Sequence, residues 1–181
     1  SQYAQTRHNI GKWAVLQYCQ ENNIDLSINK KLKAMVGKKA GHVFAIPLLY
    51  MNESGLAVSL CANWFDIDPE EIVVVHDEFD LDVGDIRRKT GGGSAGHNGI
   101  KSVENHLKTR EFNRIRIGIG KPPYSTQGAD YAVDDIRMYL APAKVQVIQE
   151  KPVCNGATTG TIKLKIRAIH ETLNAILDHK D

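Results

Sequence analysis

The stretch GGGSAGHNGIKS, residues 91–102, combines a permissive backbone with two side chains that can hold a substrate. Glycines at this density let a chain turn tightly or lie close to a bound group, and His97 with Asn98 adds an imidazole and an amide. The stretch looks like a phosphate-binding loop, but its lysine stands one position too late for GxxxxGK[ST]. A GxGxxG match is also present, without the acidic residue expected about 20 positions later. Nucleotide binding therefore rests on the glycines alone, and the loop could also lie against another part of the chain or against a substrate that meets His97 and Asn98.

His8 and Asp77 have the residue types and positions that proton transfer requires. His8, in TRHN, precedes a predicted helix, and the positive end of a helix favours the neutral, proton-accepting imidazole. Asp77 directly follows a predicted apolar strand, where a single carboxylate is suited to hold an imidazole. For a histidine taken alone, a capping or surface role remains the alternative. The acids around Asp77 lack EF-hand spacing, so no metal site is predicted there.

A third candidate is the segment Tyr50-Met51-Asn52, which follows a predicted strand and precedes a predicted helix. In open α/β sheets, ligands bind outside the carboxyl ends of the strands. Asp77 follows a strand directly, and the glycine loop lies between a strand and a helix. The rule therefore marks all three places as candidate ligand-binding positions.

Hydrophobic periodicity predicts the elements that must position these residues. Apolar residues at helical spacing indicate helices, strict alternation a half-buried strand, and an unbroken β-branched run a fully buried strand. The predicted helices span about 10–23, 52 or 54 to 66, 97–107, 141–150 and 163–178, and the predicted strands span 33–38, 42–47, 71–76, 85–90 and 113–120. The second helix is expected to bury Leu56, Leu60, Cys61, Trp64 and Phe65.

The alternation of helix and strand favours an α/β protein. We predict one three-layer domain over residues 1–181, with a mixed, mostly parallel central sheet flanked by helices. The length of 181 residues, with 42% hydrophobic and 24% charged residues, suits a single globular domain. No apolar run approaches the ~20 residues that a membrane helix needs. The three cysteines lie far apart without metal-type spacing, as in the reducing cytoplasm.

Charge is distributed unevenly along the chain although the net charge is only +2. Residues 66–85 hold nine acids and no Lys or Arg, and residues 87–121 hold nine bases against two acids, which gives that segment a charge of +7. A charged block of this kind is either a solvated face or a surface for a polyanion such as RNA, where bases displace counterions.

Taken together, these stretches resemble the bacterial-type peptidyl-tRNA hydrolases. The resemblance covers about residues 3–133 and preserves the order and spacing of the family's motifs. It is carried by YAQTRHNIG (3–11), YMNESG (50–55), HDEFDLDVGDIRRKTGGG (76–93), GHNGIKS (96–102) and FNRIRIGIGKP (112–122).

The resemblance implies hydrolysis of the ester that joins a peptide to the 3′ end of tRNA. It implies a cytoplasmic monomer without metal or cofactor, with peptidyl-tRNA as its partner and no membrane. His8 would be the general base that activates water, and Asp77 would orient it. The implied substrate contacts are Tyr3, Tyr50, Asn52, His97, Asn98 and Arg116, and the implied contacts to tRNA phosphates are Arg87, Lys89 and Lys101.

The sequence departs from the family's pattern at both ends. It starts just after the family's first strand and GLGNPG loop, so we expect an N-terminally incomplete domain. Beyond about residue 134 it follows the family's lid and C-terminal helices only loosely. The alternative function is a catalytically silent RNA-binding relative, against which the retained His8, Asp77, Asn52 and Asn98 argue.

Overall fold

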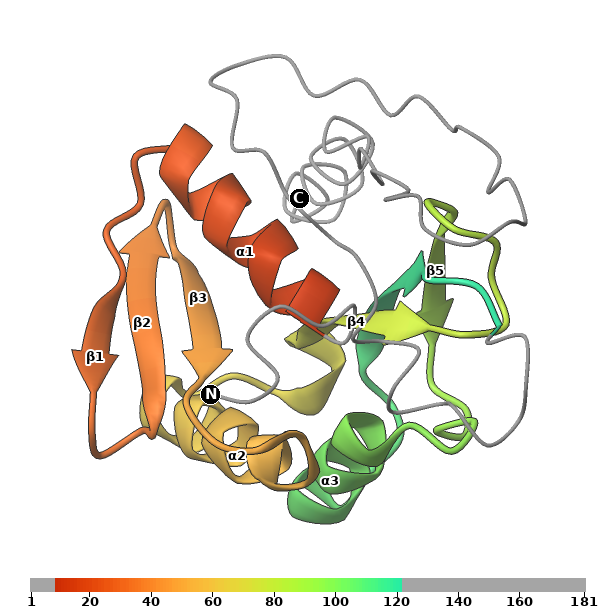
Figure 1. The fold of residues 1–181 in the computed structure, drawn as a ribbon. Helices are drawn as coiled ribbons and strands as arrows, with labels where there is room; N and C mark the ends of the chain where they lie inside the picture. The colour runs from red at the N-terminus through yellow and green to blue at the C-terminus, as the bar shows by residue number, and fades with distance from the viewer. Residues whose placement is uncertain (1–8, 122–181) are drawn as a thin grey trace. The chain divides into compact units, whose positions relative to one another are not determined.

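The fold was analysed in a computed structural model that describes residues 9–121 (Figure 1). The helices are α1 (Ile10–Glu21), η2 (Met51–Glu53), α2 (Ser54–Phe65), η3 (Pro69–Glu71) and α3 (Asn98–Leu107). The strands are β1 (Ser27–Asn29), β2 (Ala34–Lys39), β3 (His42–Pro47), β4 (Val73–Glu78), β5 (Ile86–Thr90) and β6 (Asn113–Gly118). The helices predicted at 141–150 and 163–178, and the candidate residues Tyr3 and His8, lie outside the described residues.

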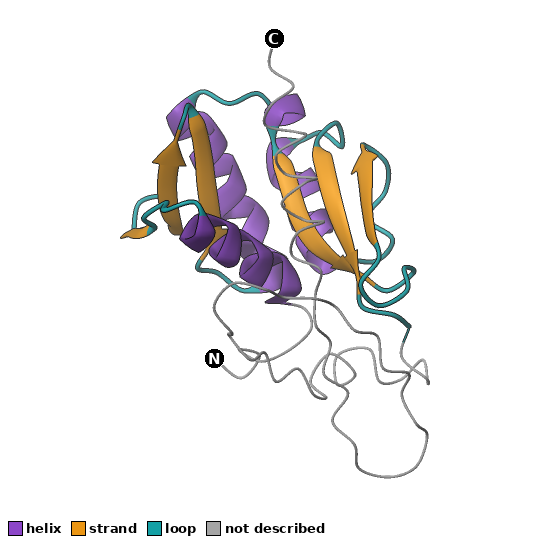
Figure 2. Ribbon diagram, turned by 90° about the horizontal axis from the view of Figure 1, so that it is seen from above, coloured by secondary structure: helices purple, strands orange, loops and turns teal. Residues whose placement is uncertain are grey.

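The strands form two three-stranded sheets, seen as two groups of orange arrows in Figure 2. The first has the order β1-β2-β3 and is antiparallel throughout, and the second has the order β4-β6-β5. Ala40 and Gly41, with φ values of 47° and 79°, close the turn between β2 and β3. Two consecutive left-handed residues are typical of the tight turn that matches the twist of a hairpin. The described residues therefore form an α/β fold, as predicted.

Contacts divide the described residues into two compact units. The first unit contains residues 9–14, 75–87 and 116–121, and the second contains residues 15–74 and 88–115. The strands β4, β5 and β6 each have residues in both units. Asp77 and Arg116 belong to the first unit, whereas Tyr50, Asn52, His97 and Asn98 belong to the second.

The second unit has two apolar clusters, one on each side of α2. One joins Leu32 and Val36 of the hairpin region to Ala57 and Cys61 of α2. The other joins Ile100 and Val103 of α3 to Phe112, with Val58 of α2 packed against them. In the same unit, the ring of Tyr18 on α1 stacks on Phe44 of β3 at a centroid distance of 5.5 Å, and Figure 1 shows α1 beside that strand.

All the helices and strands predicted within the described residues are present, and no end is displaced by more than two residues. The prediction for the buried side of α2 is wrong at Trp64, which is 59% exposed. The residues that α2 buries are small: Gly55, Ala57, Cys61 and Ala62. The small residues lie where α2 is closely covered, Gly55 by Ser102 of α3 and Ala57 and Cys61 by the hairpin cluster, and Trp64 belongs to neither apolar cluster. The short strand β1 was not predicted, because three residues are too few to show a period.

The close packing of α2 on α3 centres on Gly55. A methyl group at this position would overlap the backbone carbonyl of Ser102 on α3. The Gly55 amide also donates a hydrogen bond of 3.0 Å to the Ser102 hydroxyl, which satisfies one of the free amides in the first turn of α2. Glycine at position 55 is therefore a packing requirement.

Within residues 9–121, none of the helices has the length and apolar character needed to cross a membrane.

We expect Gly55→Ala to destabilise the protein by about 1–3 kcal/mol, the usual cost of overpacking a well-filled contact. The measurement is urea unfolding followed by circular dichroism. Gly93→Ala is the matched control, because a methyl group at Gly93 meets nothing within 4 Å. Equal losses of stability for the two variants would contradict the packing argument.

Candidate active site

Two segments of the second unit meet at a glycine of α3 and bring candidate residues onto neighbouring elements. A methyl group at Gly99 would lie 2.6 Å from the sulfur of Met51, so the Met51 side chain rests directly on the first turn of α3. Asn52 follows Met51 on η2, and Asn98 precedes Gly99 at the start of α3. The structure therefore brings together the two elements that carry the predicted asparagines.

Asn52 and Asn98 are both exposed, and Tyr50 is 73% exposed. Tyr50 stands at the start of η2, where its carbonyl accepts a 2.9 Å hydrogen bond from the amide of Glu53. An exposed amide can donate hydrogen bonds to an oxygen that becomes negative during a reaction. The asparagines thus have the exposure that substrate binding requires.

His97 caps the N-terminus of α3. Its ring atom Nδ1 accepts hydrogen bonds from the amides of Gly99 at 3.0 Å and Ile100 at 3.3 Å. Because Nδ1 acts as an acceptor, the neutral ring carries its proton on Nε2. His97 is therefore a hydrogen-bond donor at Nε2, and its ring orientation is fixed by the helix that Asn98 begins.

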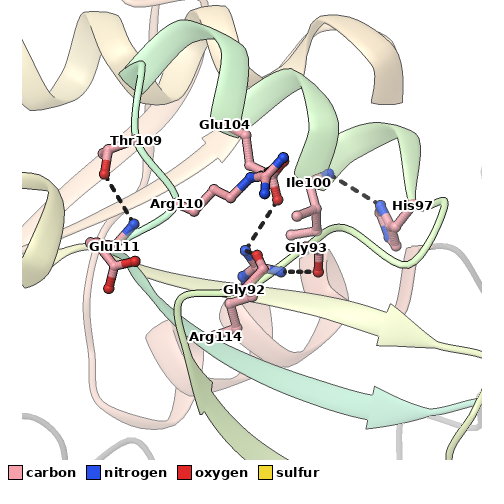
Figure 3. A network of polar contacts seen from close by, with 9 residues as sticks. All are labelled: Gly92, Gly93, His97, Ile100, Glu104, Thr109, Arg110, Glu111 and Arg114. Carbon is pink, nitrogen blue, oxygen red and sulfur yellow. Dashed lines mark hydrogen bonds and ion pairs between the residues drawn. The ribbon is translucent and has the colours of Figure 1, made fainter.

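The glycine loop is held by a buried arginine. Arg114 is 2% exposed, and its guanidinium donates to the carbonyls of Gly93 at 3.0 Å and Gly92 at 2.5 Å (Figure 3). The same guanidinium pairs with Glu104 of α3 at 3.2 Å and lies over the ring of Phe112. Arg114 thus connects the loop, the helix that follows it and the strand from which it extends.

The loop differs from a phosphate cradle, which would direct backbone amides at a bound anion. Carbonyl oxygens of the loop point at an arginine of the same chain, and the amide of Gly91 donates to the carbonyl of Phe112 at 3.2 Å. Gly91, Gly92 and Gly96 have φ values of 64°, 79° and 87°, which favour glycine. Other parts of the same chain lie against this loop: Arg114 at the carbonyls of Gly92 and Gly93, Lys89 beside Gly92 and Glu111 beside Gly91.

Asp77 is the buried carboxylate of the first unit. It is 1% exposed and lies within β4, one residue before the end of the strand, rather than after it. The neighbouring His76 donates from Nδ1 to the backbone carbonyl of Asp77 at 2.6 Å, since a carbonyl can only accept. In the same unit, a methyl group at Gly11 would overlap the carbonyl of Val75, so the first turn of α1 lies against β4.

Many of the bases counted in residues 87–121 are already paired with acids. Arg116 lies 3.6 Å from Glu78, Lys121 lies 2.8 Å from Asp80, and Arg87 lies 3.3 Å from Asp85. The hydrogen bond from Lys121 lowers the pKa of the Asp80 carboxyl below its usual value. Arg110 and Arg114 both pair with Glu104, so at least five of the nine bases have acid partners. The surface available to a polyanion is smaller than the charge count suggests.

Lys89 and Lys101 complete the predicted basic contacts in the second unit. The side chain of Lys89 lies over the glycine loop, where a methyl group at Gly92 would be 3.0 Å from its ammonium nitrogen. Lys101 is exposed on the first turns of α3, three residues after Asn98. Lys89 therefore lies close in space to the loop that carries His97 and Asn98, and Lys101 lies close to these two residues in sequence.

The two cysteines of the described chain are buried and poorly suited to act as nucleophiles. Burial raises the pKa of the Cys19 thiol to about 11 and raises that of Cys61 in the same direction, so neither is ionised near neutral pH. Between residues 9 and 121, no three His, Cys, Asp or Glu side chains gather as metal ligands would.

Sequence reasoning missed four residues that arrange this site: Met51, Ser102, Glu104 and Arg114. The helical spacing of Gly99, Ser102 and Val103, which places all three on one face of α3, could have indicated that this face packs against a neighbour. Arg114 had no such signal, because an arginine in an alternating strand is normally assigned to the solvent side.

We expect His97→Ala to lower stability by about 1 kcal/mol, because the first amides of α3 lose their acceptor. His97→Asn keeps a good N-cap side chain and is expected to retain most of that stability. Thermal and urea unfolding of both variants measure the difference. A loss of the same size in His97→Asn would show that capping is not the stabilising role of His97.

We expect Arg114→Ala to destabilise by about 3 kcal/mol or more, because it leaves a largely buried Glu104 carboxylate and two loop carbonyls without their main donor. Arg110→Ala is the matched control: its side chain is 66% exposed, so losing its pair with the same glutamate costs about 1 kcal/mol or less. Urea unfolding compares the two, and similar losses would contradict a central role for Arg114.

Comparisons with known proteins match the chain to one family along nearly its whole length. The family model described as peptidyl-tRNA hydrolase matches residues 1–174. A peptidyl-tRNA hydrolase of Francisella tularensis subsp. novicida is 46% identical over 138 residues, which cover 74% of this chain and 72% of the relative. A peptidyl-tRNA hydrolase of Mycolicibacterium gilvum is 39% identical over 178 residues, which cover 96% of this chain and 91% of the relative.

The fold comparison agrees with the sequence comparison. The crystal structure of peptidyl-tRNA hydrolase from Acinetobacter baumannii matches with a TM-score of 0.68 and 39% sequence identity, over 74% of this chain and 69% of that one. The predicted resemblance is therefore confirmed, and the chain belongs to the peptidyl-tRNA hydrolase family.

Proposed function

We propose that this protein hydrolyses the ester bond between a peptide, or an N-blocked amino acid, and the 3′ end of tRNA. Membership of the peptidyl-tRNA hydrolase family supports the reaction. The structural observation that carries the proposal is the contact of Met51 with Gly99, because it sets the exposed Asn52 and Asn98 on adjoining elements. Such a pair of amides suits a substrate whose carbonyl oxygen becomes negative when water attacks.

His8 is the proposed general base. It takes a proton from water, and the resulting hydroxide attacks the ester carbonyl. The bond to the tRNA oxygen then breaks, and the imidazolium returns its proton to that leaving oxygen, which gives free peptide and free tRNA. Asp77 is proposed to hold the imidazole in the orientation and tautomer that accept this proton. The contact of Gly11 with Val75 supports a pairing of His8 with Asp77, because Gly11 follows His8 by three positions and Val75 precedes Asp77 by two.

The remaining proposed roles divide between the substrate's reacting end and its tRNA. The amides of Asn52 and Asn98 and the Nε2 proton of His97 donate to the peptide end, and Arg116 contributes to substrate binding. Tyr3 and Tyr50 contact the tRNA 3′ end, which the 73% exposure of Tyr50 supports. Arg87, Lys89 and Lys101 bind tRNA phosphates without reading sequence.

The proposal includes the finer features of the fold and the setting. The whole chain would form one three-layer domain with a mixed, mostly parallel central sheet, acting as a monomer in the cytoplasm. Its chemistry, with a histidine base and amide donors, would be carried by side chains, without a metal or cofactor.

We expect His8→Ala to reduce the rate of tRNA release from N-blocked aminoacyl-tRNA about a hundredfold or more, because general-base catalysis is lost. Asp77→Asn keeps the shape of the side chain but not its charge, and it is expected to lower kcat at least about tenfold. The assay follows release of the labelled amino acid over time.

His42→Ala at the start of β3 is the matched histidine control and should retain wild-type activity. Equal rates for wild type and His8→Ala would overturn the mechanism. If the wild-type chain binds tRNA without releasing the amino acid, the catalytically silent RNA-binding alternative is correct.

A further inference from the structure

A second basic surface lies on the hairpin sheet, far along the sequence from the bases of residues 87–121. Residues 26–52 hold five lysines and no acid. Three of them, Lys30, Lys31 and Lys33, are exposed on the turn that joins β1 to β2, and we name them the lysine turn. No step of the proposed mechanism uses the lysine turn.

The lysine turn is ordered by its own residues. The side-chain oxygen of Asn29 accepts hydrogen bonds from the amides of Lys31 at 3.1 Å and Leu32 at 3.2 Å. Leu32 is 2% exposed and belongs to the apolar cluster under the sheet. Because Leu32 points inward, the lysines on either side of it are held at the surface, and less conformational entropy is lost when they bind a ligand.

The lysine turn is joined to the segment that leads into the candidate active site. The carbonyl of Lys33 accepts a 2.9 Å hydrogen bond from the amide of Leu48, directly after the pairing of Ala34 with Pro47. Leu48 is 47% exposed, and Tyr50 follows it by two residues with 73% exposed. The lysines therefore lie at the same end of the sheet as the exposed tyrosine that precedes Asn52.

The two lysines at the other end of the hairpin are engaged within the chain. The Lys38 ammonium lies 4.2 Å from the centre of the Phe65 ring, and that of Lys39 donates to the backbone carbonyl of Asn22. Among the hydrogen bonds and ion pairs of residues 9–121, none involves the ammonium group of Lys30, Lys31 or Lys33. The turn thus presents three positive charges that are available to a ligand.

We propose that the lysine turn binds phosphate groups of the tRNA whose 3′ end is held near Tyr50 and Asn52. This proposal rests on the proposed function. Ammonium groups suit phosphate as point charges, and they bind any sequence. An exposed aromatic ring beside such charges suits an unstacked base of a single-stranded end. This combination favours RNA over an acidic protein or a membrane surface.

The test compares two double variants of the full chain that lose the same charge: Lys30→Gln/Lys31→Gln in the lysine turn and Lys38→Gln/Lys39→Gln at the opposite end of the hairpin. Fluorescence anisotropy with labelled deacylated tRNA gives the dissociation constant over a range of salt concentrations. The first variant is expected to weaken binding roughly tenfold at low salt and to reduce the slope of log affinity against log salt by about 1.5. The second is expected to leave both unchanged, and circular dichroism confirms that each is folded.

Equal slopes of log affinity against log salt for the wild type and Lys30→Gln/Lys31→Gln would overturn the proposal. It would also be overturned if the wild-type protein bound phosphatidylserine vesicles but not tRNA. The release assay separates this outcome from failure of the proposed function. If the wild type hydrolyses the ester and the variant binds tRNA as the wild type does, only the proposal about the lysine turn is wrong. Loss of tRNA affinity in the variant, with no hydrolysis by the wild type, removes the hydrolase assignment and keeps the surface. If the proposed function and the lysine-turn proposal are both correct, the variant is expected to have a higher KM than the wild type and the same kcat.

Discussion

The buried guanidinium of Arg114 is the constraint on which the second unit depends. A charge removed from water is tolerated when it is paired with an opposite charge and hydrogen-bonded. Glu104 supplies the opposite charge, and the carbonyls of Gly92 and Gly93 accept two further hydrogen bonds. These groups come from strand β6, helix α3 and the loop that precedes α3, so the contacts of one arginine join all three. The glycines are needed because the carbonyls reach Arg114 only through left-handed backbone at Gly91 and Gly92.

The position of the asparagines follows from this arrangement. The loop held by Arg114 leads into α3, and His97 caps that helix with a ring nitrogen, so Asn98 begins on an ordered turn. Helix α3 then sets the position of η2 and the start of α2 through two close contacts, Met51 on Gly99 and Gly55 against Ser102. Asn52 lies between these contacts in sequence. Packing therefore fixes the backbone that carries the two amides, as preorganised binding of a developing charge would require.

Much of this fold follows from the sequence, and the parts that do not have a common physical cause. The alternation at residues 113–118 and the glycines before His97 were sufficient to predict β6 and the start of α3, because those signals are local. Size suggested that Trp64 is buried, whereas the fold buries small residues of α2, Gly55 against α3 and Ala57 and Cys61 in the hairpin cluster. Arg114 was counted as a surface base because its partners are 10 and more than 20 positions away. For the candidate site, the family resemblance implied Asn52 and Asn98, but the contact between Met51 and Gly99 could not be read from spacing.

The same reasoning explains why charge counts along the chain misjudge the basic surface. Residues 87–121 look like the strongest polyanion site, yet several of their bases pair with acids such as Glu78, Asp80 and Glu104, which the fold brings to them. Residues 26–52 carry fewer bases, but no acid lies among them, and Leu32 and Asn29 hold the lysine turn outward. Affinity for a polyanion depends on how many cations can release counterions when they meet phosphate. A small, unpaired group of lysines can therefore contribute more than a larger group whose charges are already neutralised within the protein.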